Sequence, residues 1–227
     1  YLEGGSGTGR ARMAVTIDPG GTAFWSGAYP YNPHQHPWVS HLPGDAPALA
    51  EGVFEGIARR MVEEFKLCRQ AELEAADSYD PWEHDEFFKN FDQSNLTDEE
   101  RDLLPPVVVV THSASTDCEE LERLLTSTHP IRVVIINTQA VAVRDAESGE
   151  PEADSGRLAG IQAENSLGYL LLSQRDVYVL QTSVGNPGHL IQGVADGLRQ
   201  RRPAVFHIFA PDPQTNGLPP ELIIDQA

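Results

Sequence analysis

Histidine and serine side chains that could take part in catalysis lie together in the middle of the chain. His112 is followed by Ser113 and Ser115, and a serine hydrolase needs a serine hydroxyl beside a histidine base. A nucleophilic serine of this kind usually stands on a sharp strand-to-helix turn with glycines on both sides. Neither serine has such surroundings. The pattern therefore does not favour serine catalysis.

Two other short patterns have the composition of ligand sites. His34 and His36 are two residues apart and His41 is near, but a zinc site would need further converging ligands. We favour solvated loop histidines. Residues 5–9 read Gly-Ser-Gly-Thr-Gly, like a phosphate loop, yet they precede the first apolar segment instead of following it. We interpret residues 1–11 as a linker.

Five segments rich in β-branched residues would have to position these groups. Their nearly continuous apolar character is typical of strands in a parallel sheet that is covered on both faces. Because helical patterns alternate with them, we predict a doubly wound α/β domain with a mostly parallel sheet and helices on both faces. The expected strands are residues 12–17, 107–111, 131–137, 177–182 and 204–210, and the expected helices are residues 46–75, 117–125, 156–172 and 187–201.

We expect a single domain over residues 12–227, with an irregular excursion at residues 77–105. Residues 77–95 are acidic and aromatic, and we expect them to pack over the domain and to offer an interface. Thr97 begins a capping-box pattern that predicts a short helix before the prolines at 105 and 106. Because the chain starts at Tyr1 and its first residues resemble a connecting segment, we expect it to be a piece of a longer polypeptide.

Composition limits the classes of partner. The net charge of −18 argues against nucleic acid and against anionic membranes, because both are bound through clustered lysine and arginine. No apolar run reaches the roughly 20 residues needed to cross a bilayer. Cys68 and Cys118 are too few for a disulfide framework or a four-thiolate site. We expect a soluble, cytoplasmic protein.

In a doubly wound sheet, ligands bind at the carboxyl ends of the strands. The loops that matter are therefore residues 18–24, 112–116, 137–145, 183–189 and 212–217. If the chain were an unrelated hydrolase or a binder of small molecules, its polar groups would come from these loops. Those groups are Asp18, Asn137, Ser183, Asn186 and Asp212.

Four passages occur in an order and spacing that point to a known family. They are residues 20–30 (GGTAFWSGAYP), 49–55 (LAEGVFE), 131–139 (IRVVIINTQ), and 177–186 (VYVLQTSVGN) with 203–211 (PAVFHIFAP). Over almost the full chain they resemble the C-terminal thiamine-diphosphate domain of pyruvate:ferredoxin (flavodoxin) oxidoreductases. The resemblance implies the thiamine-diphosphate type of α/β fold and a parent activity of oxidative 2-oxoacid decarboxylation with acylation of coenzyme A.

The residues at the cofactor positions of that family differ here. The family holds magnesium and thiamine diphosphate through Gly-Asp-Gly after one strand and through an asparagine in the loop after the next. This chain has Thr111-His112-Ser113 and Val143 at those positions, and magnesium demands oxygen ligands. The vestigial cleft implied by the resemblance consists of His112, Ser113, Asn137, Thr138, Ala140, Val143, Gly185 and Asn186.

The iron-sulfur ligands implied by the resemblance are also missing. Family members supply four cysteines, whereas this chain has Gly21 and Asp212 at two of the positions and no Cys-x-x-Cys before the first expected strand. An iron-sulfur cluster needs thiolate ligands. We therefore expect this chain to hold no cofactor and no metal.

Two main hypotheses follow from the resemblance. In the first, the domain is catalytically degenerate and serves assembly or docking, with other domains of the same polypeptide and further copies of itself as partners. In the second, it is a working part of a 2-oxoacid oxidoreductase with a divergent thiamine site, in which His112 and Thr138 position the diphosphate. A hydrolase or a binding protein of another kind, built on the same strand ends, remains a third.

Overall fold

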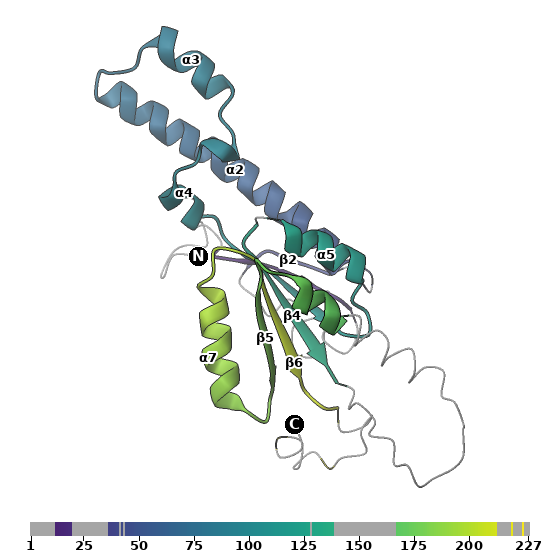
Figure 1. Cartoon of the computed structure of the whole chain (residues 1–227). Coiled ribbons are helices and arrows are strands. Elements are labelled where there is room, and N and C mark those ends of the chain that lie inside the picture. The colour runs from purple at the N-terminus through teal and green to yellow at the C-terminus, as the bar shows by residue number, and fades with distance from the viewer. Residues whose placement is uncertain are drawn as a thin grey trace.

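The computed structural model describes residues 12–19, 36–40, 42, 44–127, 129–138, 167–212, 219 and 224. A six-stranded sheet lies at its centre (Figure 1), with strand order β2-β1-β3-β4-β6-β5 and every neighbouring pair parallel. This arrangement confirms the predicted α/β class. The strands are β1 (Ala14–Ile17), β2 (Trp38–Val39), β3 (Val107–His112), β4 (Ile131–Asn137), β5 (Tyr178–Ser183) and β6 (Ala204–Phe209).

The five predicted strands all form, each within two residues of its expected ends. The short strand β2 was not predicted, because Trp38 and Val39 stand alone between polar residues and carry no periodic signal. Pairing with Val15 and Thr16 of β1 makes these two residues a strand at the edge of the sheet. Tertiary contact thus overrides a local sequence that indicates only a loop.

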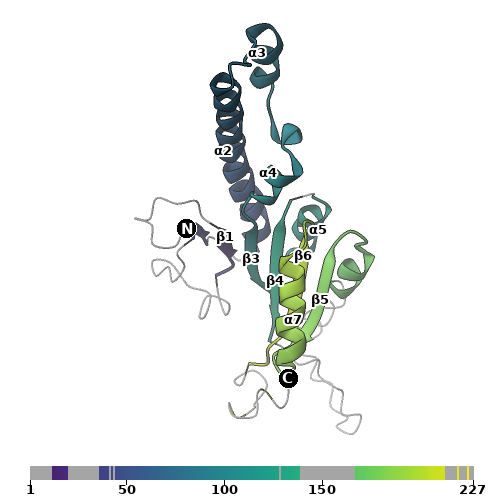
Figure 2. The same ribbon diagram turned by 90° about the vertical axis from the view of Figure 1, so that its left-hand side faces the viewer.

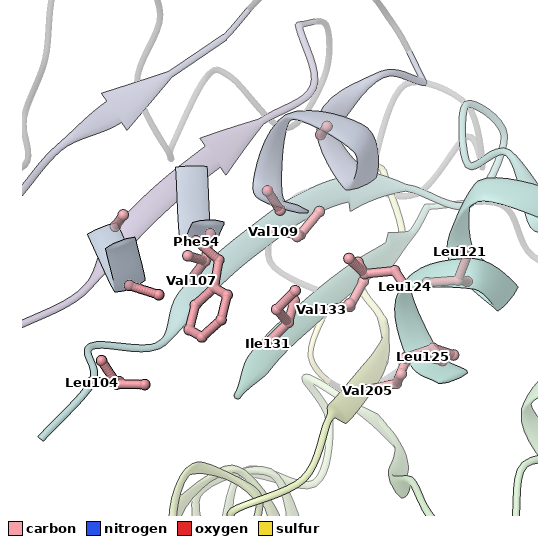
Figure 3. Packing of buried hydrophobic residues seen from close by; sticks show 14 of the residues in the cluster. Phe54, Leu104, Val107, Val109, Leu121, Leu124, Leu125, Ile131, Val133 and Val205 are labelled. Atoms are coloured by element: carbon pink, nitrogen blue, oxygen red, sulfur yellow. The ribbon is translucent and has the colours of Figure 1, made fainter. Parts of the chain in front are cut away.

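The helices of the described segments cover both faces of the sheet. Phe54 of α2 and Leu121 of α5 pack in one core cluster with the β3 and β4 side chains of one face (Figure 3), whereas Val194 of α7 packs against Leu180 of β5 on the other. Residues 167–173 are also helical. The helices are α2 (Ala46–Ala75), α3 (Pro81–Lys89), η1 (Gln93–Asn95), α4 (Asp98–Asp102), α5 (Cys118–Thr126) and α7 (Pro187–Leu198).

Two glycines bring α7 close to the sheet. A Cβ atom at Gly193 would overlap Leu180, and one at Gly197 would lie 2.7 Å from Cζ of Phe206 and 2.9 Å from Cε1 of Tyr178. Only a residue without a side chain fits at such distances. The helix begins at a proline and is capped by Asn186, but it ends at Leu198, three residues before the predicted end.

Helix α2 is longer than the sheet is wide, and its second half extends away from the domain (Figure 2). We call residues 63–102, which include α3 and α4 at its side, the helical arm. Phe88 and Phe91 are buried in the arm, at 2% and 6% exposure. Arg69 forms an ion pair with Glu100 and lies 5.1 Å from the centre of the Phe91 ring. The buried core of the sheet thus continues along the arm.

The predicted excursion at residues 77–105 needs correction. It is not irregular, because residues 81–89 form α3, whose N-cap Asp80 accepts a hydrogen bond from the backbone of Trp82. It packs along the distal half of α2 instead of over the sheet. The predicted capping box at Thr97 and Glu100 is confirmed at the start of α4.

Two further predictions lie wholly or partly outside the described residues. The linker at residues 1–11 is one, and the first part of the helix expected at residues 156–172 is the other. Among the helices of the described segments, none combines the length and the apolar character needed to cross a membrane.

Candidate functional site

The strand order reverses between β1 and β3. From β1 the chain goes to β2 on one side, and from β3 it goes to β4 on the other. In parallel sheets the crevice for a ligand opens at such a point, beside the carboxyl ends of the strands. Asp18, which follows β1, and Thr111 and His112, which end β3, lie at this point, and we refer to the position as the crevice.

Asp18 is fully buried at this crevice and is held by donors from three segments. Its carboxylate accepts hydrogen bonds from the Thr111 hydroxyl and from the backbone N–H groups of Gly44 (N···O 3.0 Å) and Ala46 (3.3 Å). The Ser115 hydroxyl lies 3.4 Å away and also reaches the carbonyl of His112. Both carboxylate oxygens are therefore occupied by protein donors.

These contacts give Asp18 the role of a helix cap supplied from the sheet. Asp45 occupies the N-cap position of α2, but its side chain makes no capping bond to the helix and accepts one from the backbone of Leu42 instead. Asp18 accepts from the first-turn N–H of Ala46 in its place. A carboxylate at a helix N-terminus also interacts favourably with the helix dipole.

Burial raises the pKa of Asp18 above its usual range, because an ionised carboxylate loses solvation in the interior. The hydrogen bonds from Thr111, Ala46 and Gly44 act in the opposite direction, and the negative charge of Asp45 adds to the rise. Desolvation is the largest effect. The crevice thus contains one carboxyl group whose pKa is higher than that of an ordinary aspartate.

His112 forms a hydrogen bond with Thr138 at the ends of β3 and β4. Its Nε2 atom lies 2.8 Å from Thr138 Oγ1, and its Nδ1 atom accepts a hydrogen bond from the backbone N–H of Ala114 (3.1 Å). Because Nδ1 accepts, Nε2 carries the proton and donates to the threonine. Burial lowers the pKa of His112, so the imidazole is neutral at pH 7.

The serines near His112 do not form a catalytic triad. The His112 imidazole bonds to Thr138 and to a backbone amide, while Ser115 bonds to Asp18 and to a carbonyl oxygen. Ser113 is buried, and its backbone N–H donates to the carbonyl of Ile136. No serine hydroxyl is aligned with a histidine base at this crevice within the described residues.

The remaining predicted positions lie at the ends of β4, β5 and β6. Asn137 is buried, and its carbonyl accepts from the backbone of Ala210, while the backbone N–H of Asp212 donates to the carbonyl of Thr138 (3.3 Å). Asn186 caps α7 by accepting from the backbone of His189 (3.2 Å), and Gly185 precedes it in the turn. Ala140, Val143 and Gly21 lie outside the described residues.

Within the described residues, no three histidine, cysteine, aspartate or glutamate side chains are grouped to hold a metal ion. Cys68 is exposed, and Cys118 is half-buried with a pKa raised by burial. Comparison with known proteins adds no further assignment, since neither a family model nor a curated protein matches this sequence.

Proposed function

We propose that this chain is a catalytically silent domain of the thiamine-diphosphate type, from a protein related to 2-oxoacid:ferredoxin oxidoreductases. In this role it serves as a scaffold on which other domains of the same polypeptide dock. One observation carries the proposal. The polar side chains at the carboxyl ends of β1, β3 and β4 bond to one another, as Asp18 does to Thr111 and His112 to Thr138.

Electrostatics at the crevice disfavours a diphosphate. A neutral His112 supplies no positive charge, and Asp18, once ionised, would repel phosphate oxygens. Breaking the existing hydrogen bonds to free a donor would leave buried polar groups unpaired, at about 1–3 kcal/mol each. Hydrogen bonds between the side chains of the crevice stabilise the fold, and this fits a structural role.

A second candidate function is a divergent thiamine-diphosphate site in a working oxidoreductase. His112 and Thr138 lie at the ends of the neighbouring strands β3 and β4, so one diphosphate could contact both side chains once it replaced the hydrogen bond between them. Bound thiamine diphosphate would supply the carbanion chemistry of 2-oxoacid decarboxylation. The residues of this chain would then bind and orient it, with His112 donating from Nε2.

Calorimetric titration with thiamine diphosphate and magnesium separates the two functions. We expect no binding by the native chain and a gain of binding by the double variant His112→Asp, Val143→Asn, which restores the oxygen ligands that the family resemblance implies. The matched control is His189→Asp with Val143→Asn, which puts the new carboxylate at α7. Native binding with a Kd on the order of micromolar would contradict the scaffold proposal and establish the divergent site.

The scaffold proposal includes self-association in a cytoplasmic setting. The surface of α3, at the tip of the helical arm, carries two exposed aromatic side chains, Trp82 at 97% and Phe87 at 43% exposure. We expect a second copy of the chain to cover this surface. Phe88 is buried, so it belongs to the arm's core and not to an interface.

The mass in solution tests this expectation. Sedimentation equilibrium should give a multiple of the chain mass for the native protein and a smaller mass for Trp82→Ser, with unchanged circular dichroism. Leu172→Ser serves as control, because Leu172 is equally exposed at 85% but lies outside the arm. A native chain that sediments as a monomer would remove self-association from the proposal.

A further inference from the structure

A groove lies at the amino-terminal ends of the strands, whereas the crevice described above lies at their carboxyl ends. The volume of the groove is about 1180 Å³. The segments that lead into β3, β4, β5 and β6 line it, together with α4 and the end of α5. Pro106, Pro130 and Pro203 stand just before three of these strands and form part of the wall.

Arginines dominate the groove. The whole chain has only 16 lysines and arginines against 34 acidic residues, yet six arginines line this one groove, accompanied by three aspartates. In this groove basic residues outnumber acidic ones, whereas in the chain as a whole acidic residues outnumber basic ones. The arginines are Arg101, Arg132, Arg175, Arg199, Arg201 and Arg202.

Arg132 carries a buried charge that no carboxylate balances. Its side chain is at the start of β4 and is 3% exposed. The guanidinium donates to the carbonyls of Ile131 (3.1 Å), Arg202 (2.8 Å) and Gln200, and its Nε is buried with no partner. Among the described residues, no acidic side chain pairs with it. A buried cation without a counter-ion is costly, and a bound anion would offset that cost.

The ion pairs of the other arginines are exposed to solvent: Arg101 pairs with Asp98 and Arg199 with Asp196 (3.0 Å), and all four of these side chains are more than 40% exposed. Arg201 pairs with Asp102 (2.6 Å) and Arg202 with Asp176, but all four side chains are about half or more exposed, so the pairs contribute little and exchange readily. Arg175 forms no ion pair with any described residue.

His129 adds a second buried group without a partner. Its Nδ1 atom is buried and makes no hydrogen bond, while its ring packs against Phe54 with ring centres 4.5 Å apart. Together with Arg132 it places two polar groups at the wall of the groove that the protein itself does not satisfy. Buried polar groups of this kind are rare unless a ligand or a water completes them.

We propose that this groove binds a small molecule that carries two or more phosphoryl groups. Planar guanidinium groups match phosphate oxygens in pairs, and several of them on one wall select a ligand with several negative charges. The volume is slightly larger than the roughly 300–1,000 Å³ that is usual for small-molecule sites. The site does not depend on the proposed scaffold role, because it uses different residues at the amino-terminal ends of the strands.

Titration calorimetry at low salt with inorganic pyrophosphate, and separately with ATP, tests the proposal. We expect binding that weakens as salt is added. The double variant Arg175→Ala, Arg202→Ala should bind at least roughly tenfold more weakly, because each arginine lost removes a charge-assisted hydrogen bond. The matched control is Arg59→Ala, Arg60→Ala, which removes the same charge from the exposed face of α2 and should bind as the native chain does.

Three outcomes would overturn the proposal. They are no binding of either probe, an equal loss of affinity in the control variant, and binding only to phosphatidylcholine vesicles that contain a phosphoinositide. The last would assign the groove to a lipid headgroup and not to a free ligand. Arg132→Met removes the buried guanidinium from the wall of the groove. If that variant does not fold, the double variant at Arg175 and Arg202 still tests the proposal, because both of these side chains are exposed.

Discussion

Asp18 illustrates how one side chain connects distant parts of the molecule. It accepts hydrogen bonds from Gly44, Ala46 and Thr111, which lie 26, 28 and 93 residues away in sequence. Gly44 has a φ of +88°, and a Cβ atom there would lie 2.9 Å from the carbonyl oxygen of Ser115. The backbone turn that presents its N–H to Asp18 therefore requires glycine.

The raised pKa of Asp18 predicts a pH effect on stability. A native acid with a raised pKa holds its proton where the unfolded chain has released it, so stability falls as pH rises through that interval, by up to about 1.4 kcal/mol per pH unit. Asp18→Asn keeps an oxygen for the two N–H groups and cannot ionise. We expect the native chain to lose stability relative to this variant as pH rises above the usual aspartate range.

Urea unfolding of both proteins across acidic and neutral pH measures the difference. The native chain and the variant have all other carboxylates in common, so the contributions of those groups to the pH dependence of stability cancel in the comparison. Two stability curves that stay parallel over the whole range would show that Asp18 titrates alike in the folded and unfolded chains.

For individual residues, the sequence was enough to predict which side chains lie at the candidate site, but not which hydrogen bonds they form. It named Asp18, His112 and Thr138 among the loop residues, because each follows an apolar strand. It could not show that Asp18 caps α2, since that role depends on chain segments far apart. The groove was missed for the same reason: Arg199, Arg201 and Arg202 lie together in sequence, but only the fold brings Arg101, Arg132 and Arg175 to them.

Among the elements, α7 depends on the absence of side chains on one face. Gly193 and Gly197 are one helical turn apart and both face the β5–β6 side of the sheet. Helix propensity alone would favour alanine at each position. Packing decides against it, because Leu180 and Phe206 fill the space in which a methyl group would stand.

Glycine-to-alanine substitutions should therefore have opposite effects in two helices. We expect Gly197→Ala to reduce the free energy of unfolding by about 1–3 kcal/mol through overpacking against Phe206. Gly56→Ala on α2, where a Cβ would meet nothing within 4 Å, should increase it by about 0.5–1 kcal/mol. Denaturant midpoints measure both, and a stabilised Gly197 variant would mean that α7 can shift outward at little cost.

Element bounds were predictable where a periodic pattern is long. Residues 46–75 and 131–137 match α2 and β4 at both ends, because apolar spacing continues through each segment. Residues 81–89 were not recognised as a helix, since Trp82, Phe87 and Phe88 have weaker helix propensity and obscure the capping signal of Asp80.

In the molecule as a whole, the core of the sheet continues into the helical arm. The arm's aromatic cluster includes Phe88 and Phe91, whose ring centres are 6.1 Å apart, and the ion pair of Arg69 with Glu100 fixes its lower end. The same buried cluster continues under the sheet, where Val107, Ile131 and Val205 belong to it (Figure 3). A segment that extends from a domain and has few partners opens more easily than the domain does.

Removing Phe88 should therefore loosen the arm alone. Phe88→Ala deletes a side chain that is 2% exposed, and such changes cost about 3–5 kcal/mol in a core. By hydrogen exchange with mass spectrometry, we expect faster exchange in residues 66–102 and unchanged exchange in β3, β4 and β6. Leu67→Ala, which removes a side chain that is 62% exposed on the same arm, is the control and should leave exchange in both regions unchanged. Faster exchange throughout the sheet in Phe88→Ala would show that arm and sheet unfold together.

The arm is also part of a long chain segment between two adjacent strands. β1 and β3 are neighbours, yet Asp18, which follows β1, and Thr111 of β3 are separated by 93 residues in sequence. Closing such a loop costs entropy before any contact repays it, and contacts of high sequence separation form late in folding. The pairing of β3 with β4 is more local, so we expect β1 to join the sheet after them. Until it does, β3 is an open edge, and the newly made chain is most prone to aggregate in that interval.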